Sequence, residues 1–468
     1  MLRAVTSRRY HPPACHSRRR IRLEPKPLPT RREAFAFWLK LGFVSFGGPA
    51  GQIALMHEEL VERRRWISEG RFLHALNYCM LLPGPEAQQL ATYIGWLMHR
   101  TTGGLMAGGL FVLPSLFILV GLSWVYMAFG HLAAIAGLFY GIKPAVTALV
   151  VHAAWRVGSR TLKNAWLAAI AVAAFAAIFV QHWPFPLIVL GAGAVGVVGG
   201  RIAPQRFKAA SAHAASPGAS AAPALIDDDS ATPSHAVFTW ARLLKVVAVF
   251  GALWAATIGA LAAACGWHGT LTQMAWFFTK AALLSFGGAY AVLPYVNQGA
   301  VDHYHWLTAA QMMDGLALGE TTPGPLIMVV AFVGFVGGWT HAALGAGAPA
   351  MAGVAAAVVV TFFTFLPSFF FNLAGGPFIE STHGNPRLTA PLTAITAAVV
   401  GVIASLAAFF ALHVLWPRGP GGGLDGAALA IGTAAALALW RFRGGVIPVV
   451  LGAAMAGLLL TLAGLSPT

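Results

Sequence analysis

Long apolar runs separated by short polar segments dominate this chain. Runs of about 20 residues, the length that a helix needs to cross the hydrocarbon core of a bilayer, recur from residue 105 onward. None alternates apolar and polar residues as barrel strands do, so the runs predict membrane-spanning helices. The expected spans are 105–128, 131–155, 165–181, 184–200, 239–262, 348–373, 388–413, 424–440 and 446–464.

Two interruptions of the apolar pattern occur twice, 240 residues apart. Residues 45–48 and 285–288 both read SFGG, and residues 83–85 and 323–325 both read PGP. Matched Gly and Pro breaks in two corresponding segments are typical of secondary transporters built from a duplicated membrane unit. The break points are therefore the first place to look for a bound solute.

The segments around the first PGP motif are too short to cross a membrane. Residues 69–82 and 86–99 each span about 14 residues, against about 20 for a crossing, so we expect two half-helices that meet at the motif. Residues 34–56 also predict a re-entrant hairpin that turns at SFGG. Irregular backbone of this kind is tolerated at membrane depth only where protein or a water-filled cavity surrounds it.

The charge distribution indicates a membrane protein with two oppositely inserted halves. Only 10% of the residues are charged, against roughly 25% in soluble domains. Four arginines lie in residues 57–71, whereas the matched loop, 297–311, has no Lys or Arg. The positive-inside rule puts the first loop in the cytoplasm and the second outside. The expected fold is therefore an all-α polytopic membrane protein with two inverted-topology repeats and broken or re-entrant helices.

These patterns divide the chain into five parts. The net charge is +15, and ten of the 30 Lys and Arg lie in the first 32 residues, which predicts a cytoplasmic tail beside a membrane and not a nucleic-acid-binding arm. The other polar break is rich in Ala, Ser and Pro and predicts a flexible cytoplasmic linker. The parts are a basic tail (1–32), a first repeat (33–202), the linker (203–238), a second repeat (239–415) and additional C-terminal membrane helices without a strong partner in the first half (416–468).

The breaks suggest an oxyanion site. A helix that starts at a break presents unpaired backbone N–H groups and the positive end of its dipole, and proline suits its first position. A simple packing kink is the alternative for each break alone, but the matched pairs favour a site. The candidate substrate-binding residues at the breaks are Ser45, Phe46, Gly47, Gly48, Pro83, Gly84, Pro85, Gln88, Gln89, Ser285, Phe286, Gly287, Gly288, Thr321, Thr322, Pro323, Gly324 and Pro325.

Charged residues inside apolar segments are costly and so become functional candidates. Lys40 and Lys280 precede the two SFGG motifs at matched positions and are expected to balance an anion's charge, unless they snorkel to the interface. Glu86 and Glu320 flank the PGP motifs and are candidates to carry a proton, or else helix-terminal acids. Lys143 is a further coupling candidate, which faces the anion path or pairs with a carboxylate. Asp314 is a weaker candidate, expected to be a helix-face residue near the external surface.

Other chemistry finds no support in the sequence. Three scattered cysteines and 16 histidines show no metal-ligand spacing. The chain has no P-loop, nucleophile elbow or HExxH motif, so ATP-driven transport and membrane proteolysis are not indicated. We expect no enzyme activity, metal or cofactor.

Together these motifs resemble the chromate ion transporter family in its long, two-domain form. The likeness covers about residues 34–460, whereas the tail of residues 1–32 is not part of the family pattern. It implies efflux of chromate across the bacterial inner membrane, driven by the proton-motive force, and hence chromate resistance. The residues that carry it are 43–49 (FVSFGGP), 82–90 (LPGPEAQQL), 93–96 (YIGW), 111–115 (FVLPS), 283–290 (LLSFGGAY) and 320–328 (ETTPGPLIM).

The residues alone leave other functions open. Chromate and sulfate are near-isosteric tetrahedral dianions, so a sulfate or general oxyanion transporter fits the same breaks. A membrane enzyme acting on a phosphorylated lipid would use the same helix starts, but no nucleophile accompanies them. A purely structural subunit needs no matched breaks. The coupling ion, the direction of transport and the oligomeric state, a homodimer included, stay undecided.

Overall fold

The structure is a computed structural model that describes residues 28–46, 48–80, 82–207, 224–227, 230, 233–286, 289–381, 389–419, 423–442 and 445–464. Within these residues the chain is helical, and its strand-like pairing is a single isolated bridge. Six helices in the described ranges are long and apolar enough to cross a membrane. The prediction of an all-α polytopic membrane protein is confirmed. The tail before residue 28, Gly47, Gly287 and Gly288 lie outside the described residues.

The helices of the first half follow the predicted breaks. They are α1 (Arg31–Val44), α2 (Gly48–His57), η1 (Glu58–Arg63), α3 (Glu69–Cys79), α4 (Glu86–Phe129), α5 (Ala133–Thr161), α6 (Ala165–Phe179), α7 (Phe185–Ile202) and η2 (Pro204–Phe207). The sequence around SFGG separates α1 from α2, and the PGP motif separates α3 from α4. His99 and Arg100 are non-helical, so α4 is a short helix of residues 86–98 followed by a long one of residues 101–129.

The second half repeats this order after one additional helix. Its elements are η3 (Ser234–Ala236), α8 (Trp240–Cys265), α9 (Thr270–Leu284), α10 (Ala289–Asn297), η4 (Gln298–His303), α11 (Ala309–Thr321), η5 (Leu326–Met328), α12 (Val329–Thr340), α13 (Pro349–Ser381), α14 (Thr389–Leu415), α15 (Gly426–Trp440) and α16 (Val446–Leu462). The half-helices predicted at the first PGP motif are present as α3 and the short part of α4, and the second motif separates α11 from η5 and α12 in the same way.

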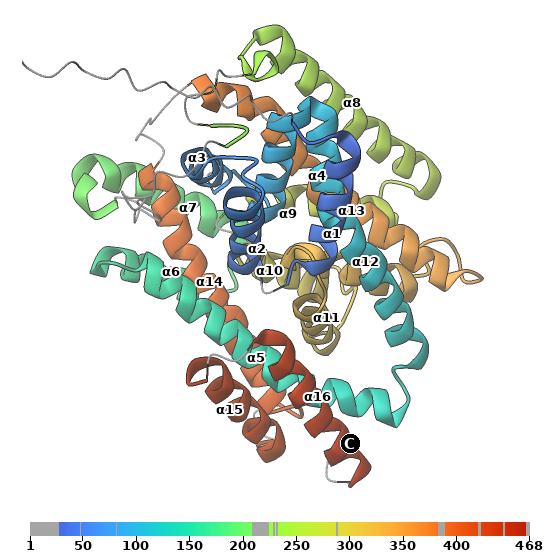
Figure 1. Cartoon of the computed structure of the whole chain (residues 1–468). Helices are drawn as coiled ribbons and strands as arrows, with labels where there is room; N and C mark the ends of the chain where they lie inside the picture. The colour runs from blue at the N-terminus through green and yellow to red at the C-terminus, as the bar shows by residue number, and fades with distance from the viewer. Residues whose placement is uncertain are drawn as a thin grey trace, which may run out of the picture.

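The broken helices form a central group, and the helices that follow them lie around it (Figure 1). In the centre, α13 of the second half packs on α4 of the first, and α1 and α9 pack on α4 and α13 respectively. Outside this group α5 crosses α14. Helices α6 and α7 pack on α14, while α15 and α16 pack on α5 (Figure 1). The C-terminal helices α15 and α16 thus pack on α5 in the way that α6 and α7 pack on α14.

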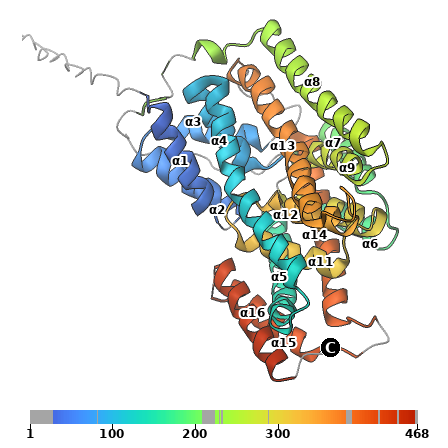
Figure 2. The same cartoon turned by 90° about the vertical axis from the view of Figure 1, so that its right-hand side faces the viewer.

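Helix α8 has no counterpart among the described residues of the first half. It lies along α13 and α9 (Figure 2) and, of its side chains, only Ile258 is buried. A helix this apolar and this exposed fits a lipid-facing position, since lipid chains cover apolar side chains as a protein core would.

The linker between the halves departs from the predicted flexible segment. Leu225 and Ile226 pair through their backbone with residues 65–68 of the first half, and Ile226 is 6% exposed. The Arg71 guanidinium donates hydrogen bonds to the carbonyls of Asp227 and Ser230. Burial of the Ile226 side chain also removes its backbone from water, so its N–H and carbonyl need partners, which Trp66 and Ser68 of the loop supply. This part of the linker is therefore docked, while residues 208–223 and 228–229 lie outside the described residues.

Close helix packing generates a first prediction. A Cβ on Gly457 of α16 would overlap backbone atoms of Gly137 and Gly141 in α5, whereas a Cβ on Gly452 of the same helix meets nothing within 4 Å. We expect Gly457→Leu to destabilise the fold by about 1–3 kcal/mol through overpacking, and Gly452→Leu to have little effect. Folded yield and melting temperature of the purified variants check this. Equal melting of the two would show that α16 does not depend on this contact.

Candidate functional site

The two halves meet through a reciprocal pair of backbone hydrogen bonds at the predicted breaks. The N–H of Gly84 donates to the carbonyl of Ser285 at 2.9 Å, and the N–H of Gly324 donates to the carbonyl of Ser45 at 2.8 Å. Each residue of one bond is 240 positions from its equivalent in the other. A contact in which each half offers the same two groups to the other is what a two-fold relation between them produces.

The glycines of the PGP motifs are required by conformation and by space. Gly84 and Gly324 have φ values of +128° and +107°, which L side chains rarely adopt. A Cβ on Gly84 would overlap the Ser368 hydroxyl, and a Cβ on Gly324 would lie 2.6 Å from Cβ of Ser115. Each turn is therefore covered by a serine of the other half, from the matched LPS motifs.

These bonds change the expected role of the turn glycines. We expected Gly84 and Gly324 to leave their backbone N–H groups open to an oxyanion, but both groups already donate to protein carbonyls. The donors that remain near the first turn are the N–H groups of Glu86, Ala87 and Gln88, which have no intrahelical acceptor because they begin α4.

Buried polar side chains surround both turns. The Gln52 amide donates to the carbonyls of Gly324 at 2.5 Å and Ser45 at 3.4 Å, and the Gln89 amide donates to the carbonyl of Pro83 at 2.7 Å. Gln88 donates to the Thr92 hydroxyl at 3.0 Å. The sequence analysis identified Gln88 and Gln89 but missed Gln52. A single amide within an apolar run, seven residues after Ser45, was the available signal.

Several of these buried groups have a polar atom without a hydrogen-bond partner among the described residues. Orphaned buried polar atoms are rare in proteins and mark places where an ion, a ligand or water belongs. Hydroxyl groups can donate to an anion, and a glutamine amide can turn its NH₂ toward one. The atoms are the hydroxyl oxygens of Ser45, Ser115 and Ser368, the side-chain carbonyl oxygens of Gln52, Gln88 and Gln89, and that of Asn372.

The second-half hydroxyls that the sequence suggested are already engaged. Thr321 donates to the carbonyl of Ala317 at 2.9 Å, Thr322 to that of Gly319 at 3.3 Å, and Ser285 to that of Ala282 at 2.9 Å. Phe46 is exposed and Phe286 half-buried, so neither ring closes over the turns completely. The polar groups with spare capacity come mainly from the first half and from α13.

The two candidate glutamates occupy different surroundings. Glu320 is 7% exposed near the end of α11 and accepts a hydrogen bond of 2.5 Å from the Tyr290 hydroxyl. Glu86 is half-buried at the first position of α4, where a carboxylate is favoured by the helix dipole. Tyr290 follows the second SFGG motif and was not identified from the sequence.

Lys143 pairs with a carboxylate of the other half. Its ammonium lies 3.6 Å from Asp314 Oδ2, which also accepts a hydrogen bond of 2.9 Å from Tyr126. Asp314 is 2% exposed, although the sequence suggested a helix-face residue near the surface. It lies on α11, the half-helix that leads to the second PGP motif. The pair thus ties this half-helix to α4 and α5.

Neither matched lysine contacts the turns through a described hydrogen bond or ion pair. Lys40 is exposed on α1. Lys280 is half-buried on α9, with its ammonium 5.8 Å from the ring centre of Trp276, and lies in the wall of a cavity of about 810 Å³ that the turn residues do not line. No described contact of either lysine therefore supports the role expected for it at the turns, and that role stays a prediction.

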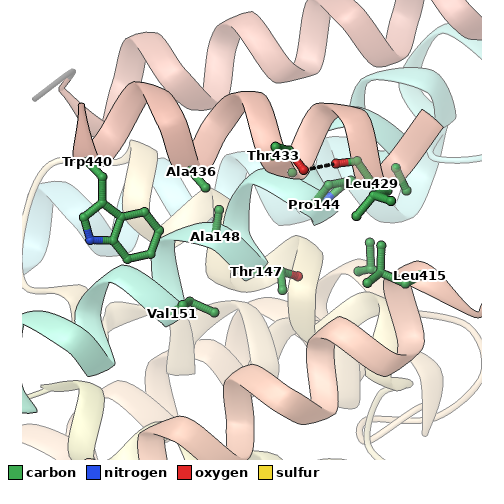
Figure 3. A pocket seen from close by; sticks show the side chains of 12 residues that line it. Pro144, Thr147, Ala148, Val151, Leu415, Leu429, Thr433, Ala436 and Trp440 are labelled. Atoms are coloured by element: carbon green, nitrogen blue, oxygen red, sulfur yellow. Dashed lines mark hydrogen bonds between the residues drawn. The ribbon is translucent and has the colours of Figure 1, made fainter. Parts of the chain in front are cut away.

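A second cavity, of about 240 Å³, lies between α5 and α15 (Figure 3). Its walls are apolar apart from Thr147 and Thr433, and the Thr433 hydroxyl donates to the carbonyl of Leu429 (Figure 3). Because the hydroxyls of both threonines already donate to backbone carbonyls of their own helices, they are not free to bind a dianion. Among the described residues, no group of three or more His, Cys, Asp or Glu could hold a metal ion.

Comparison with known proteins gives the arrangement a context. A family model described as "Chromate transporter" matches residues 32–197 and 272–458. A chromate transport protein of Pseudomonas aeruginosa is 35% identical over 92% of this chain and 92% of its own. One of Cupriavidus metallidurans is 30% identical over 81% of this chain and 82% of its own. A probable chromate transport protein of Synechococcus elongatus is 27% identical over 82% and 85%. No solved structure matches the chain.

The turn geometry predicts the effect of adding a methyl group. Gly324→Ala forces a side chain into positive φ and against Ser115, and we expect it to lower the stability of the fold by about 1–3 kcal/mol. Gly109→Ala in α4 is the control, because its Cβ would meet nothing within 4 Å. Adding Ser115→Gly should recover part of the loss. Thermal unfolding of the purified variants measures each effect, and equal melting of Gly324→Ala and the control would contradict the prediction.

The Lys143–Asp314 pair predicts strong coupling in a double-mutant cycle. Lys143→Met leaves the buried carboxylate unpaired and should cost about 3 kcal/mol, at the low end for buried pairs because 27% of the Lys143 side chain is exposed. Combining it with Asp314→Asn, which still accepts from Tyr126, should recover most of that stability. Additive losses in the melting of the single and double variants would show that the pair contributes nothing.

Proposed function

The chain belongs to the chromate transporter family, and on this premise we propose that it exports chromate across the bacterial inner membrane, driven by the proton-motive force. The observation that carries the proposal is the reciprocal pair of turns at the seam of the two halves, surrounded by buried polar atoms that lack partners. The relatives are named as transport proteins and not as enzymes. Export of chromate would confer resistance to it.

We place the solute at this seam. Ser45, Ser115 and Ser368 would donate their hydroxyl hydrogens, and Gln88 and Gln89 their amides, to the oxygens of a tetrahedral dianion. The first N–H groups of α4 would add the positive end of a helix. The motif residues Pro83, Pro85, Pro323 and Pro325 would hold the half-helices at the required angle. Neutral donors suit a substrate that must also leave.

An inverted topology is supported by contacts on each side. The docked linker holds the loop of residues 57–71, which fits a cytoplasmic position for both. Gln298 of the second half accepts a hydrogen bond from the N–H of Phe185 and donates one to the carbonyl of Trp183, which joins the α6–α7 connection to the loop that lacks Lys and Arg. With a cytoplasmic N-terminus, four crossings (the long part of α4, α5, α6 and α7) return the chain to the cytoplasm, and α8 then inverts the second half.

Proton coupling would use the ionisable groups of the second half. Glu320 with Tyr290, and Asp314 with Tyr126 and Lys143, are buried carboxylates with a hydrogen-bonding neighbour that stabilises one charge state. Glu86 of the first half, at the start of the helix proposed to hold the anion, is a further candidate to carry the proton that moves opposite to the anion.

Energetics favour outward movement. A dianion that leaves a cell negative inside gains about 4–5 kcal/mol per 100 mV, at roughly 2.3 kcal/mol per charge. The membrane potential alone can therefore expel the anion, and proton antiport adds driving force. Sulfate is the alternative substrate, because the proposed donors recognise the tetrahedral oxygens that both anions share.

Chromate accumulation in energised bacterial cells with and without the protein tests the proposal. We expect accumulation to fall severalfold when the protein is present, to stay low with excess sulfate, and to recover when a protonophore collapses the proton-motive force. Cells that carry Gln88→Leu with Gln89→Leu, at matched protein levels, should lose most of the effect. Unchanged or raised chromate accumulation with the wild-type protein would exclude export. If excess sulfate abolished the fall in chromate accumulation, sulfate would be the substrate.

A further inference from the structure

The cavity that Lys280 lines is not lined by the residues of the turns. Its wall comes from α9, α10 and η4 of that half, from the α6–α7 connection of the first half, and from α14. In Figure 1 the flanking helices α6 and α14 lie together beside the central group that contains α9 and α10. Its volume is about 810 Å³, ample for a hydrated dianion.

The wall of this cavity carries cationic and hydrogen-bonding groups. Lys280 approaches it from α9, His182 from the α6–α7 connection and His303 from η4. Within the described part of the chain, no ion pair joins Lys280 to a carboxylate, and its contact is the Trp276 ring. The acid among the residues that line the cavity is Asp302. Burial raises the pKa of Asp302, and the charges of His182, His305 and His413 lower it in part.

A buried amide points to a ligand independently of the charges. Asn297 lies in the wall and is 6% exposed, and its side-chain oxygen has no partner among the described residues. Rotation of the amide would turn its NH₂ toward an anion at no cost in other hydrogen bonds. Of the two orientations, only this one suits an oxyanion held by Lys280.

The first half keeps a lysine, Lys40, at the position that matches Lys280, but Lys40 is exposed and the loop that matches the cavity wall differs. Asn297 corresponds to His57, which forms ion pairs with Glu62 at 3.2 Å and Glu69 at 2.5 Å. The neighbouring Glu58 and Glu59 pair with Arg63 at 2.6 and 2.8 Å. The acids and bases of that loop thus contact each other, whereas the side-chain oxygen of Asn297 has no partner among the described residues.

We propose that this cavity is an outer anion vestibule, a second and weaker site for the transported tetrahedral oxyanion, held by Lys280 and Asn297 with His182 and His303 at its rim. The proposal rests on the proposed function for the identity of the solute and for the outward position of this face. A weak site between the seam and the exterior would bind the anion as an intermediate step, and the anion would dissociate from it rapidly. Focusing by an unpaired cation also raises the local concentration of the anion at the mouth.

Exchange of chromate by the purified full-length protein in liposomes tests the vestibule. Lys280→Gln should raise the half-saturating concentration of external chromate about tenfold while the maximal rate stays within twofold, because only the outer site loses its charge. Asn297→Asp should raise it further through repulsion. Lys245→Gln on α8 removes the same charge from an exposed position and should match the wild type. A lower maximal rate with unchanged half-saturation would place Lys280 at the seam and overturn the vestibule.

A binding measurement separates the vestibule from the proposed transport. Radiolabelled sulfate is titrated into the protein in non-ionic detergent without lipid. We expect two classes of site in the wild type and loss of the weaker class in Lys280→Gln, whether or not liposomes show exchange. Exchange in the wild type with identical sulfate binding in Lys280→Gln would reject the vestibule and leave transport intact. Displacement of the weaker class by small amounts of anionic lipid would assign the cavity to a lipid phosphate instead.

Discussion

Unpaired backbone at membrane depth is the constraint on which this structure depends. A helix broken at SFGG or PGP exposes N–H and C=O groups where no water is available to pair them, and each unpaired group costs several kcal/mol. The chain meets this need by pairing each broken segment with one of the other half, Gly84 with Ser285 and Gly324 with Ser45. Neither half could keep its breaks in a membrane alone. The same bonds hold the halves in register and fix where the polar seam between them lies.

The chemistry of the seam is the reason for placing the proposed site there. Once the turn carbonyls and N–H groups pair with each other, the nearby side chains are left with spare hydrogen-bonding capacity in an apolar surrounding. Ser115 and Ser368 approach the opposite turns so closely that a methyl group on the glycine would collide with them, and both hydroxyls lack partners among the described residues. An interface held together by its backbone can use its side chains for a ligand.

Local sequence patterns predicted where the helices break, but they could not predict which residues form hydrogen bonds with the breaks. Gly and Pro mark interrupted helices directly, so the half-helices and SFGG turns could be located from the sequence. The sequence could not show that Gly84 gives its N–H to a carbonyl 201 residues away, because that contact depends on how the halves meet. For the same reason Asp314 was assigned near the surface, although Lys143 and Tyr126 cover it. Ile226 was read as flexible because its docking partner is a distant loop.

Duplication supplied the scaffold, and divergence gave the halves different chemistry. The amides Gln52, Gln88 and Gln89 of the first half correspond to Val292, Met328 and Val329 in the second. Conversely, the second half has ionisable residues where the first half has Ala50, His74 and Met80; they are Tyr290, Asp314 and Glu320. Neutral donors that suit an anion thus come largely from one half, and buried carboxylates that suit a proton come from the other. The reciprocal turns join the two halves that carry these sets, so a movement of one half against the other would alter the surroundings of both. In the proposed transport, such a movement would couple the proton to the anion.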